Sequence, residues 1–239
     1  MSSKQNFRDS GHRFFSLRSF IHLRPFGPAQ LFTTSFLSII VLGSLLLLLP
    51  KATYENISYV DALFTSTSAV CVTGLNVVDT ELTFTLFGQV IILLLIQIGG
   101  LGIMTITTYF SYYFKGGSSY KSQLLVKDIT SEERLDNVFS SLKNILLITI
   151  VIEGLGFLLI FATMGKEDFT FGERVFFSLF HAISGFCNAG FSTLSGSLYD
   201  IRIRFDYPVH LIISFLIIFG GLGFPIIHNI WKYITNNIK

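Results

Sequence analysis

Long apolar runs alternate with short polar segments along this chain. Residues 31–49, 84–114, 142–164 and 208–231 form four such runs, and each contains few charged residues. A hydrocarbon core about 30 Å thick is crossed by a helix of about 20 apolar residues. The pattern therefore predicts four full membrane-spanning helices, the first of which ends at Pro50.

Two shorter segments between these runs repeat each other. Residues 64–75, FTSTSAVCVTGL, return 116 residues later as residues 180–191, FHAISGFCNAGF, with Phe, Ser, Cys and Gly at equal positions. The helical stretch over residues 59–70 rises about 1.5 Å per residue and so covers about half of a bilayer. A short helix that enters, turns and leaves is a re-entrant loop, which persists in a membrane only inside protein or beside water. The repeat therefore predicts two pore elements.

A helix-capping pattern precedes both copies. Ser58 stands three residues before Asp61, and Thr170 stands three residues before Glu173. This is the spacing of a capping box, in which side chains satisfy the free N–H groups of a first helical turn. The pattern predicts that the second pore helix, residues 171–186, begins about one turn earlier than the first.

The segments that follow the pore helices, residues 71–75 and 187–191, have the composition of a carbonyl filter. A dehydrated cation needs oxygen atoms in place of water, and an extended backbone can supply its carbonyl groups. Gly74 and Gly190 can adopt φ angles that other residues avoid, and they place no side chain in the path. Each pore helix also directs the negative end of its dipole toward the segment. The alternative is that each glycine only makes a turn.

These motifs resemble those of a known family. Residues 61–80, DALFTSTSAVCVTGLNVVDT, and 86–106, LFGQVIILLLIQIGGLGIMTI, are similar to the first repeat of the Trk/Ktr/HKT potassium transporters. Their greatest similarity is to the membrane subunit of bacterial Ktr systems. Residues 186–194, FCNAGFSTL, and 215–227, FLIIFGGLGFPII, resemble the second repeat. The likeness runs from about residue 28 to the end, and it covers two of that family's four repeats.

The resemblance implies a fold, an ion and partners. The fold is an all-α polytopic membrane protein with two tandem helix–pore loop–helix repeats, half of a four-repeat cation channel-like fold. The function is K⁺ uptake through carbonyl coordination, and the implied selectivity filter consists of Val72, Thr73, Gly74, Asn188, Ala189 and Gly190. Expected partners are membrane lipid, the remaining two repeats, a second membrane subunit in a dimer and a cytosolic nucleotide-binding regulatory subunit. K⁺ is the transported ion and Na⁺ stays open as a coupling ion; no bound cofactor and no nucleic acid are expected.

The same pattern divides the chain into segments and orients them. Residues 1–30 are a basic N-terminal segment, 31–114 the first repeat, 115–140 a linker, 141–232 the second repeat and 233–239 a tail. The segments assigned to the inside contain 12 Lys and Arg, against 5 in those assigned to the outside. By the positive-inside rule, the N-terminal segment and the linker are cytoplasmic. We therefore expect a multi-pass protein of the plasma (inner) membrane whose two pore loops enter from outside.

Two further features leave alternatives open. The motif GGLG occurs twice, and its glycines are Gly99, Gly100, Gly102, Gly220, Gly221 and Gly223. Small residues let helices approach closely, while a hinge in the pore-lining helix is the other interpretation, favoured in the second copy by Pro225. Glu153 is the one acid deep within a predicted span, and it either lines an ion path or holds the repeats together by hydrogen bonds. We favour hydrogen-bonded packing for Glu153, and packing rather than metal ligation for His181.

Composition agrees with a membrane protein and gives no sign of an enzyme. The chain is 51% hydrophobic and 13% charged, against a usual charged share of about 25%. It contains no H-E-x-x-H or G-x-S-x-G motif, and GGLG follows an apolar helix rather than a strand. The alternative to a potassium pore is a truncated, non-conducting membrane fragment or scaffold that needs a second half.

Overall fold

The computed structural model describes residues 28–115, 131–165, 169–223 and 226. The chain divides into two units, residues 1–35 and 36–239, and the first is described only from Pro28, where helix α1 begins. Within the described ranges every regular element is a helix, and the one β-bridge joins Thr53 to Phe84. The predictions for residues 1–27 and 233–239 lie outside these ranges, as does most of the predicted linker.

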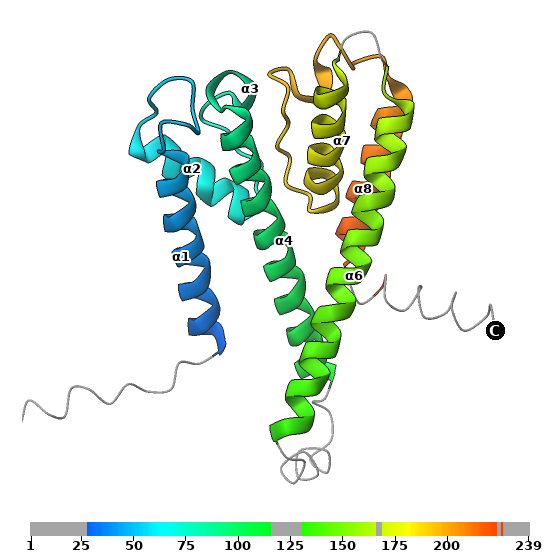
Figure 1. Ribbon diagram of the computed structural model, residues 1–239. Coiled ribbons are helices and arrows are strands. Elements are labelled where there is room, and N and C mark those ends of the chain that lie inside the picture. The colour runs from blue at the N-terminus through cyan, green and yellow to red at the C-terminus, as the bar shows by residue number, and fades with distance from the viewer. Residues whose placement is uncertain (1–27, 116–130, 166–168, 224–225, 227–239) are drawn as a thin grey trace, which may run out of the picture. The chain divides into compact units, whose positions relative to one another are not determined.

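The described helices fall into long and short ones (Figure 1). The long apolar helices are α1 (Pro28–Leu47), α4 (Leu86–Lys115), α6 (Ser131–Thr163) and α8 (Tyr207–Leu222). The short ones are α2 (Tyr59–Val70) and α7 (Phe171–Phe186), with α3 (Thr80–Thr83) and η2 (Ser197–Tyr199) in the loops. By length and composition, Leu86–Ile106 and Lys143–Thr163 can each cross a membrane, while Phe32–Leu47 and Tyr207–Leu222 are shorter apolar helices.

Both predicted caps are present at the starts of the short helices. The Ser58 hydroxyl accepts a hydrogen bond from Asp61 N at 3.1 Å and donates to the Asp61 carboxylate at 2.7 Å. Thr170 and Glu173 form a complete capping box, in which Glu173 N donates to the Thr170 hydroxyl and Thr170 N donates to the Glu173 carboxylate. As predicted, α7 is one turn longer at its start, with 16 residues against 12 in α2.

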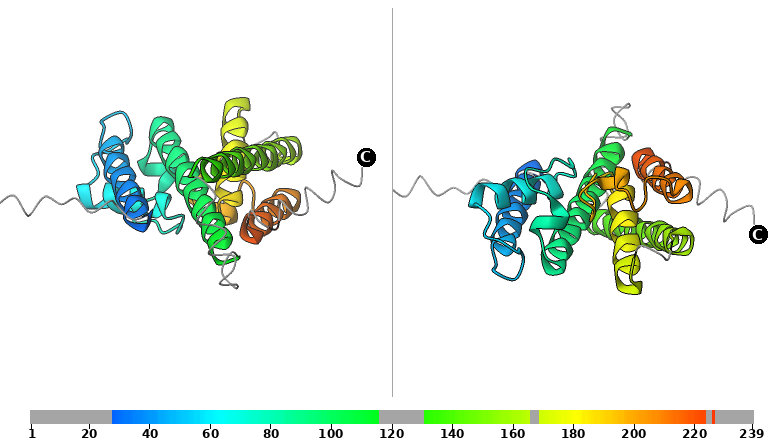
Figure 2. Two further views of the ribbon diagram at one scale, coloured as in Figure 1. Left: turned by 90° about the horizontal axis from the view of Figure 1, so that it is seen from below. Right: turned by 90° about the horizontal axis from the view of Figure 1, so that it is seen from above.

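The short helices are packed into two hydrophobic clusters. α2 packs on α4, where buried Val70, Ile92 and Ile96 belong to the first cluster. α7 packs against both α6 and α8, and buried Phe177 and Phe186 belong to the second cluster. Figure 2 shows α6, α7 and α8 together from two further directions. α4 contacts α6 and α7, and so joins the two clusters.

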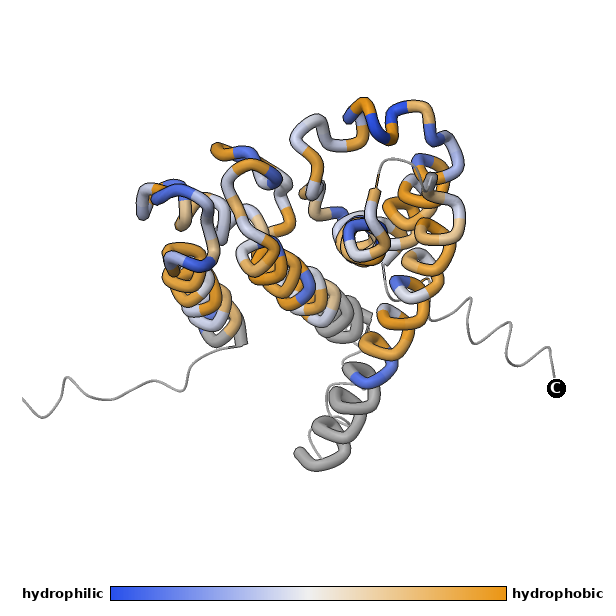
Figure 3. The backbone as a smooth tube through the Cα atoms, turned by 45° about the horizontal axis from the view of Figure 1, so that its top comes forward, coloured by the Kyte–Doolittle hydropathy of each residue, from blue (hydrophilic) through white to orange (hydrophobic). Residues whose placement is uncertain are grey.

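The outer faces of the long helices remain apolar. Leu94 of α4, Ile150 of α6 and Leu211 of α8 keep 56%, 65% and 60% of their surface exposed. In Figure 3 hydrophobic residues run along these helices, whereas hydrophilic residues gather in the connecting loops. Extended apolar faces of this kind are stable against lipid but unfavourable against water.

Hydropathy does not mark where α6 begins or where α8 ends. α6 begins at Ser131, so residues 131–140 of the predicted linker are helical. Hydropathy marks the part of a helix that meets lipid, so it does not mark the polar stretch of sequence with which α6 begins. α8 ends at Leu222, where Gly223 takes a positive φ of 76°, and residues 227–231 of the predicted span lie outside the described residues.

Candidate functional site

The segments after α2 and α7 share an unusual backbone. Val72 and Asn188, at equal repeat positions, have φ of 56° and 60°, and Gly74 and Gly190 have 68° and 75°. A positive φ at a β-branched valine is a rare, strained conformation. The positive φ at Gly74 and Gly190 agrees with the sequence prediction. The strain at Val72 was missed, since no sequence signal marks it.

The strained residues complete Schellman motifs at the ends of the short helices. Val72 N donates to Ala69 O at 3.2 Å, and Thr73 N donates to Ser68 O at 3.0 Å. The second copy has the same pair of bonds, from Asn188 N to Gly185 O at 3.0 Å and from Ala189 N to Ser184 O at 2.8 Å. A left-handed residue at this position is what the motif requires. The backbone of the two segments is therefore fixed by the helices before them.

These bonds use the N–H groups of the segments and leave the carbonyl groups unused. Within the described ranges no hydrogen bond reaches the carbonyl oxygens of Val72, Thr73, Gly74, Asn188, Ala189 or Gly190. Unpaired backbone carbonyls are costly at membrane depth unless water or an ion meets them. All six residues predicted to form a filter thus have carbonyl oxygens without a hydrogen bond in the described structure.

One serine in each repeat ties the far end of the segment to its helix. The buried Ser68 hydroxyl accepts from Leu75 N at 2.9 Å and from the Thr73 hydroxyl at 3.0 Å. Its counterpart Ser184, also buried, donates to Phe191 O at 2.7 Å. The repeat alignment showed these serines as matches, but their anchoring role became visible only in the structure.

The two segments approach each other through bare backbone. A Cβ atom on Gly74 would lie 2.5 Å from Ala189 O, and one on Gly190 would lie 3.3 Å from the Gly74 Cα atom. A side chain at Gly74 is therefore opposed both by the positive φ and by the space. The structure brings the two sets of predicted filter residues together.

The GGLG glycines mainly serve close packing. α4 is continuous through Gly99, Gly100 and Gly102, so the hinge interpretation has no helix break to support it there. An added Cβ atom would lie 2.1 Å from Val70 O at Gly99, 2.7 Å from Cys187 Sγ at Gly100 and 2.8 Å from the Phe36 ring at Gly102. In the second copy Gly220 packs on Phe186, Gly221 has no atom within 4 Å of an added Cβ, and Gly223 ends α8. Pro225 lies outside the described residues.

Glu153 and His181 both have hydrogen-bond partners. The buried Glu153 carboxylate accepts from Gln97 Nε2 at 3.2 Å and meets Cys187 Sγ at 3.9 Å. His181 stacks on Phe177 and bonds to Phe177 O and to the Ser192 hydroxyl, both at 2.9 Å. These contacts support the packing interpretation of both residues. An ion-lining role for Glu153 stays untested.

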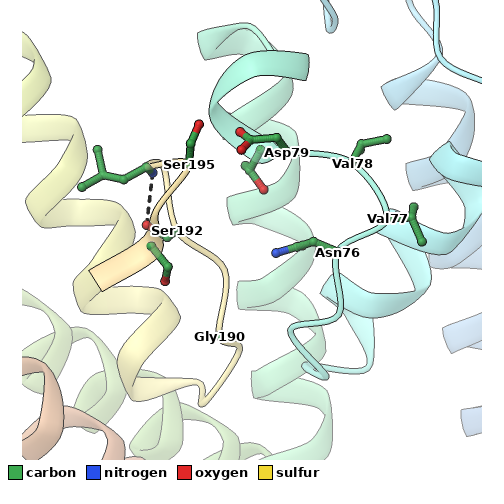
Figure 4. A pocket seen from close by; sticks show the side chains of 10 residues that line it. Asn76, Val77, Val78, Asp79, Gly190, Ser192 and Ser195 are labelled. Carbon is green, nitrogen blue, oxygen red and sulfur yellow. Dashed lines mark hydrogen bonds between the residues drawn. The ribbon is translucent and has the colours of Figure 1, made fainter. Parts of the chain in front are cut away.

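An open hollow of about 320 Å³ lies beside the segments. Figure 4 shows Asn76 and Asp79 on one wall, and Ser192 and Ser195 on the other, on the same segment as Gly190. The lining is mostly polar, and one of its residues belongs to a predicted filter segment. An ion in this hollow would meet hydroxyl, amide and carboxylate oxygens.

Residues 27–239 match the family TrkH, described as cation transport protein. The chain belongs to the TrkH family of cation transport proteins. It is 38% identical over 207 residues to the Ktr system potassium uptake protein B of Vibrio alginolyticus, covering 87% of this chain and 45% of that protein. It is 39% identical to the protein of the same name from Bacillus subtilis, and the match covers 87% of this chain and 46% of that protein. It is 37% identical to the potassium/sodium uptake protein NtpJ of Enterococcus hirae, and the match covers 86% of this chain and 46% of that protein.

Family membership confirms the resemblance seen in the sequence. It makes the chain a membrane protein of a transporter family rather than an enzyme. The chain spans about half the length of the curated relatives that it matches. The helical structure agrees with a membrane transporter, and the described residues contain no strand.

Proposed function

We propose that this chain supplies two of the four repeats of a potassium uptake pore. In this proposal α2 and α7 are re-entrant pore helices, and the six free carbonyl groups of residues 72–74 and 188–190 coordinate K⁺. The observation that carries the proposal is the duplicated Schellman geometry, which fixes the N–H groups toward the helix and leaves the carbonyl oxygens free. The identity of the ion comes from the relatives, which are potassium uptake proteins.

The chemistry of the segments favours a monovalent cation. Neither segment contains a carboxylate, whereas Ca²⁺ and Mg²⁺ sites in proteins use carboxylate oxygens. Neutral carbonyl groups replace the water around an ion without binding it too tightly to leave. Both short helices end at these segments, and each adds the negative end of its dipole.

Two repeats alone would leave the coordination incomplete. Half of the ligand shell would be missing, and polar backbone would face lipid at a cost of several kcal/mol for each unpaired group. We therefore expect transport only when two further repeats are present. The alternative is that the chain is a non-conducting fragment or scaffold.

We also infer an assembly and an orientation. The family resemblance implies a dimeric membrane part with a cytosolic nucleotide-binding subunit, and the excess of Lys and Arg in the inner segments favours an N-terminus on the inner side of the plasma membrane. Na⁺ is the candidate coupling ion, since one relative is a potassium/sodium uptake protein. With Cys71 replaced, a cysteine at the exposed Ser197 should react only with external reagents. Reaction only from inside would reverse the inferred orientation.

The proposal is tested by K⁺ uptake in cells that lack their own uptake systems. The chain is expressed alone, repeats three and four are expressed alone, and both halves are expressed together. We expect uptake only from the combination. Gly154→Ala is the control variant and should keep this uptake, because an added Cβ at Gly154 meets no atom within 4 Å. A combination that reaches the membrane but takes up no K⁺ would favour the scaffold. Full uptake by the chain alone would contradict the four-repeat pore.

A further inference from the structure

Two carboxylates join the two repeats. Gln97 of the first repeat donates a hydrogen bond to Glu153, and Ser195 N and Arg202 of the second repeat donate to Glu81. Glu153 lies within α6, among the apolar residues of a span. Glu81 lies in the first post-filter linker, residues 75–85, and its partners lie in the second post-filter linker, residues 191–206. Glu81 thus makes a polar connection between the two linkers.

Glu81 is positioned by a helix cap within its own linker. It lies in α3, and the Asp79 carboxylate caps this short helix by accepting from Glu81 N and Leu82 N, both at 2.9 Å. One Glu81 carboxylate oxygen accepts from Ser195 N at 2.7 Å. Arg202 Nη2 donates to both oxygens, at 2.8 and 2.9 Å. A single side chain therefore binds the second linker at two separate points.

Arg202, the partner of Glu81, is positioned by Asp200 and Phe169. Its Nε and Nη2 donate to the two oxygens of Asp200 at 2.8 and 3.0 Å, a two-point contact that fixes the plane of the guanidinium. The guanidinium carbon lies 5.5 Å from the centre of the Phe169 ring. The Arg202 hydrogen bonds lower the pKa of Asp200 to about 2. The Glu81 and Arg202 side chains are 28% and 31% exposed, so the pair is shielded in part from water.

Each post-filter linker follows its filter segment directly in the chain. Glu81 is seven residues after Gly74, and Ser195 is five residues after Gly190. Each segment is anchored to its own helix, by Ser68 or Ser184. Between the segments themselves the described contact is backbone against backbone at Gly74 and Ala189, with no hydrogen bond. Their separation is therefore set by the packing of α4 on α7 and by the hydrogen bonds that connect the linkers.

We propose that Glu81 and Arg202 are positioning residues for ion selectivity, which fix the spacing between the carbonyl groups of the two filter segments. This inference rests on the proposed function, because it concerns how those carbonyl groups discriminate between ions. K⁺ and Na⁺ carry the same charge and differ in size, so loosely held carbonyl groups discriminate less between them. Ser195 also lines the hollow beside Gly190, so Glu81 holds one wall of that hollow as well.

The transport test uses Glu81→Ala, Glu81→Gln and Arg202→Lys in the four-repeat assembly. Glu81→Gln keeps the shape and an acceptor for Ser195 N, and Arg202→Lys keeps the charge without the planar fork. Glu55→Gln is the matched control. Glu55 is an exposed acid of a neighbouring loop with no side-chain hydrogen bond or ion pair to the described residues. This control separates the positioning effect of Glu81 from the effect of removing one negative charge near the pore.

We expect Glu81→Ala to lower the ratio of K⁺ to Na⁺ uptake by about threefold, the effect of a partly exposed ion pair. The KM for K⁺ should rise while the maximal rate per protein in the membrane stays nearly constant. Glu81→Gln and Arg202→Lys should shift the ratio less, and Glu55→Gln should leave it unchanged. An unchanged ratio in Glu81→Ala, or an equal shift in Glu55→Gln, would overturn the proposal.

A second readout does not require transport. Spin labels at the exposed Val77 and Ser197, one in each post-filter linker, report the distance between the linkers. We expect a narrow distance distribution in the otherwise unchanged protein and a broad one in Glu81→Ala and Glu81→Gln. An equally narrow distribution in both variants would show that Glu81 does not hold the linkers. If the assembly takes up no K⁺ yet the distribution broadens, the proposed function fails while the connection between the linkers stands.

Discussion

Gly99 lies against the carbonyl group of Val70, so closely that a Cβ atom on Gly99 would be 2.1 Å from that oxygen. Gly220 stands in the same relationship to Phe186, at 1.8 Å. Val70 and Phe186 are the last residues of α2 and α7, so the first glycine of each GGLG motif receives the end of a short helix. The recurrence in both repeats explains why helix α4 needs a glycine in its interior, where glycine costs about 1 kcal/mol relative to alanine.

The first prediction concerns this close contact. Gly99→Ala should lower the free energy of unfolding by about 1–3 kcal/mol, because backbone atoms rather than a flexible side chain oppose the new methyl group. Thermal unfolding in detergent measures the effect. Gly154→Ala is the control, since it adds the same methyl group to α6 with no atom within 4 Å. Equal melting temperatures for the two variants would contradict the packing role.

The second prediction compares the two filter glycines. Gly74→Ser should reduce the preference for K⁺ over Na⁺ more than Gly190→Ser does. Both positions have positive φ, but a Cβ on Gly74 would be 2.5 Å from Ala189 O, whereas one on Gly190 would be 3.3 Å from its nearest neighbour. Competition between the two ions for uptake measures the preference. A larger effect at Gly190, or none at Gly74, would count against the observed approach of the segments.

The third prediction concerns the serine anchor of the second segment. Ser184→Ala should cost about 1–3 kcal/mol, because it leaves the buried Phe191 carbonyl without its partner. Ser178, on the same helix, is the control. It is also buried, and its hydroxyl has no hydrogen-bond partner in the described structure. Ser178→Ala should therefore leave the melting temperature nearly unchanged; a loss as large as that of Ser184→Ala would refute the anchoring.

The fourth prediction concerns pH. The pKa of Asp200 is lowered from 3.8 to about 2 by its hydrogen bonds with Arg202. A carboxyl group with a lowered pKa stabilises the folded state above its ordinary pKa, and this contribution is lost as the pH falls through the lowered value. The melting temperature of the unmodified protein should therefore exceed that of Asp200→Asn at pH 5. The difference should shrink between about pH 4 and pH 2; a constant difference would contradict the contact.

Local features of the sequence predicted more than distant contacts did. Ser58 and Thr170 mark helix starts because a cap acts within one turn, and Gly74 and Gly190 mark positive φ because only glycine adopts it freely. Val72 gives no such signal, since its conformation is imposed by the helix end. Its strain could be found only in the backbone itself.

Contacts between the repeats were beyond prediction for a different reason. Glu81 and Arg202 are 121 residues apart, and their pairing depends on how the two repeats pack. The sequence favours a hydrogen-bonded Glu153 but does not identify its partner, which is the amide of Gln97. A neutral amide satisfies a buried carboxyl group without a charge pattern in the sequence. The polar first turns of α6 were also missed, because hydropathy detects lipid contact rather than helix.

In the proposed pore, the free carbonyl groups of the two segments coordinate the transported ion. The most direct measurement is the anomalous scattering of Tl⁺ or Rb⁺, used as substitutes for K⁺ in crystals of the four-repeat assembly. We predict anomalous peaks beside the carbonyl oxygens of residues 72–74 and 188–190, and their loss in Gly74→Ser. Peaks that lie only elsewhere, in an assembly shown to transport K⁺, would contradict the account.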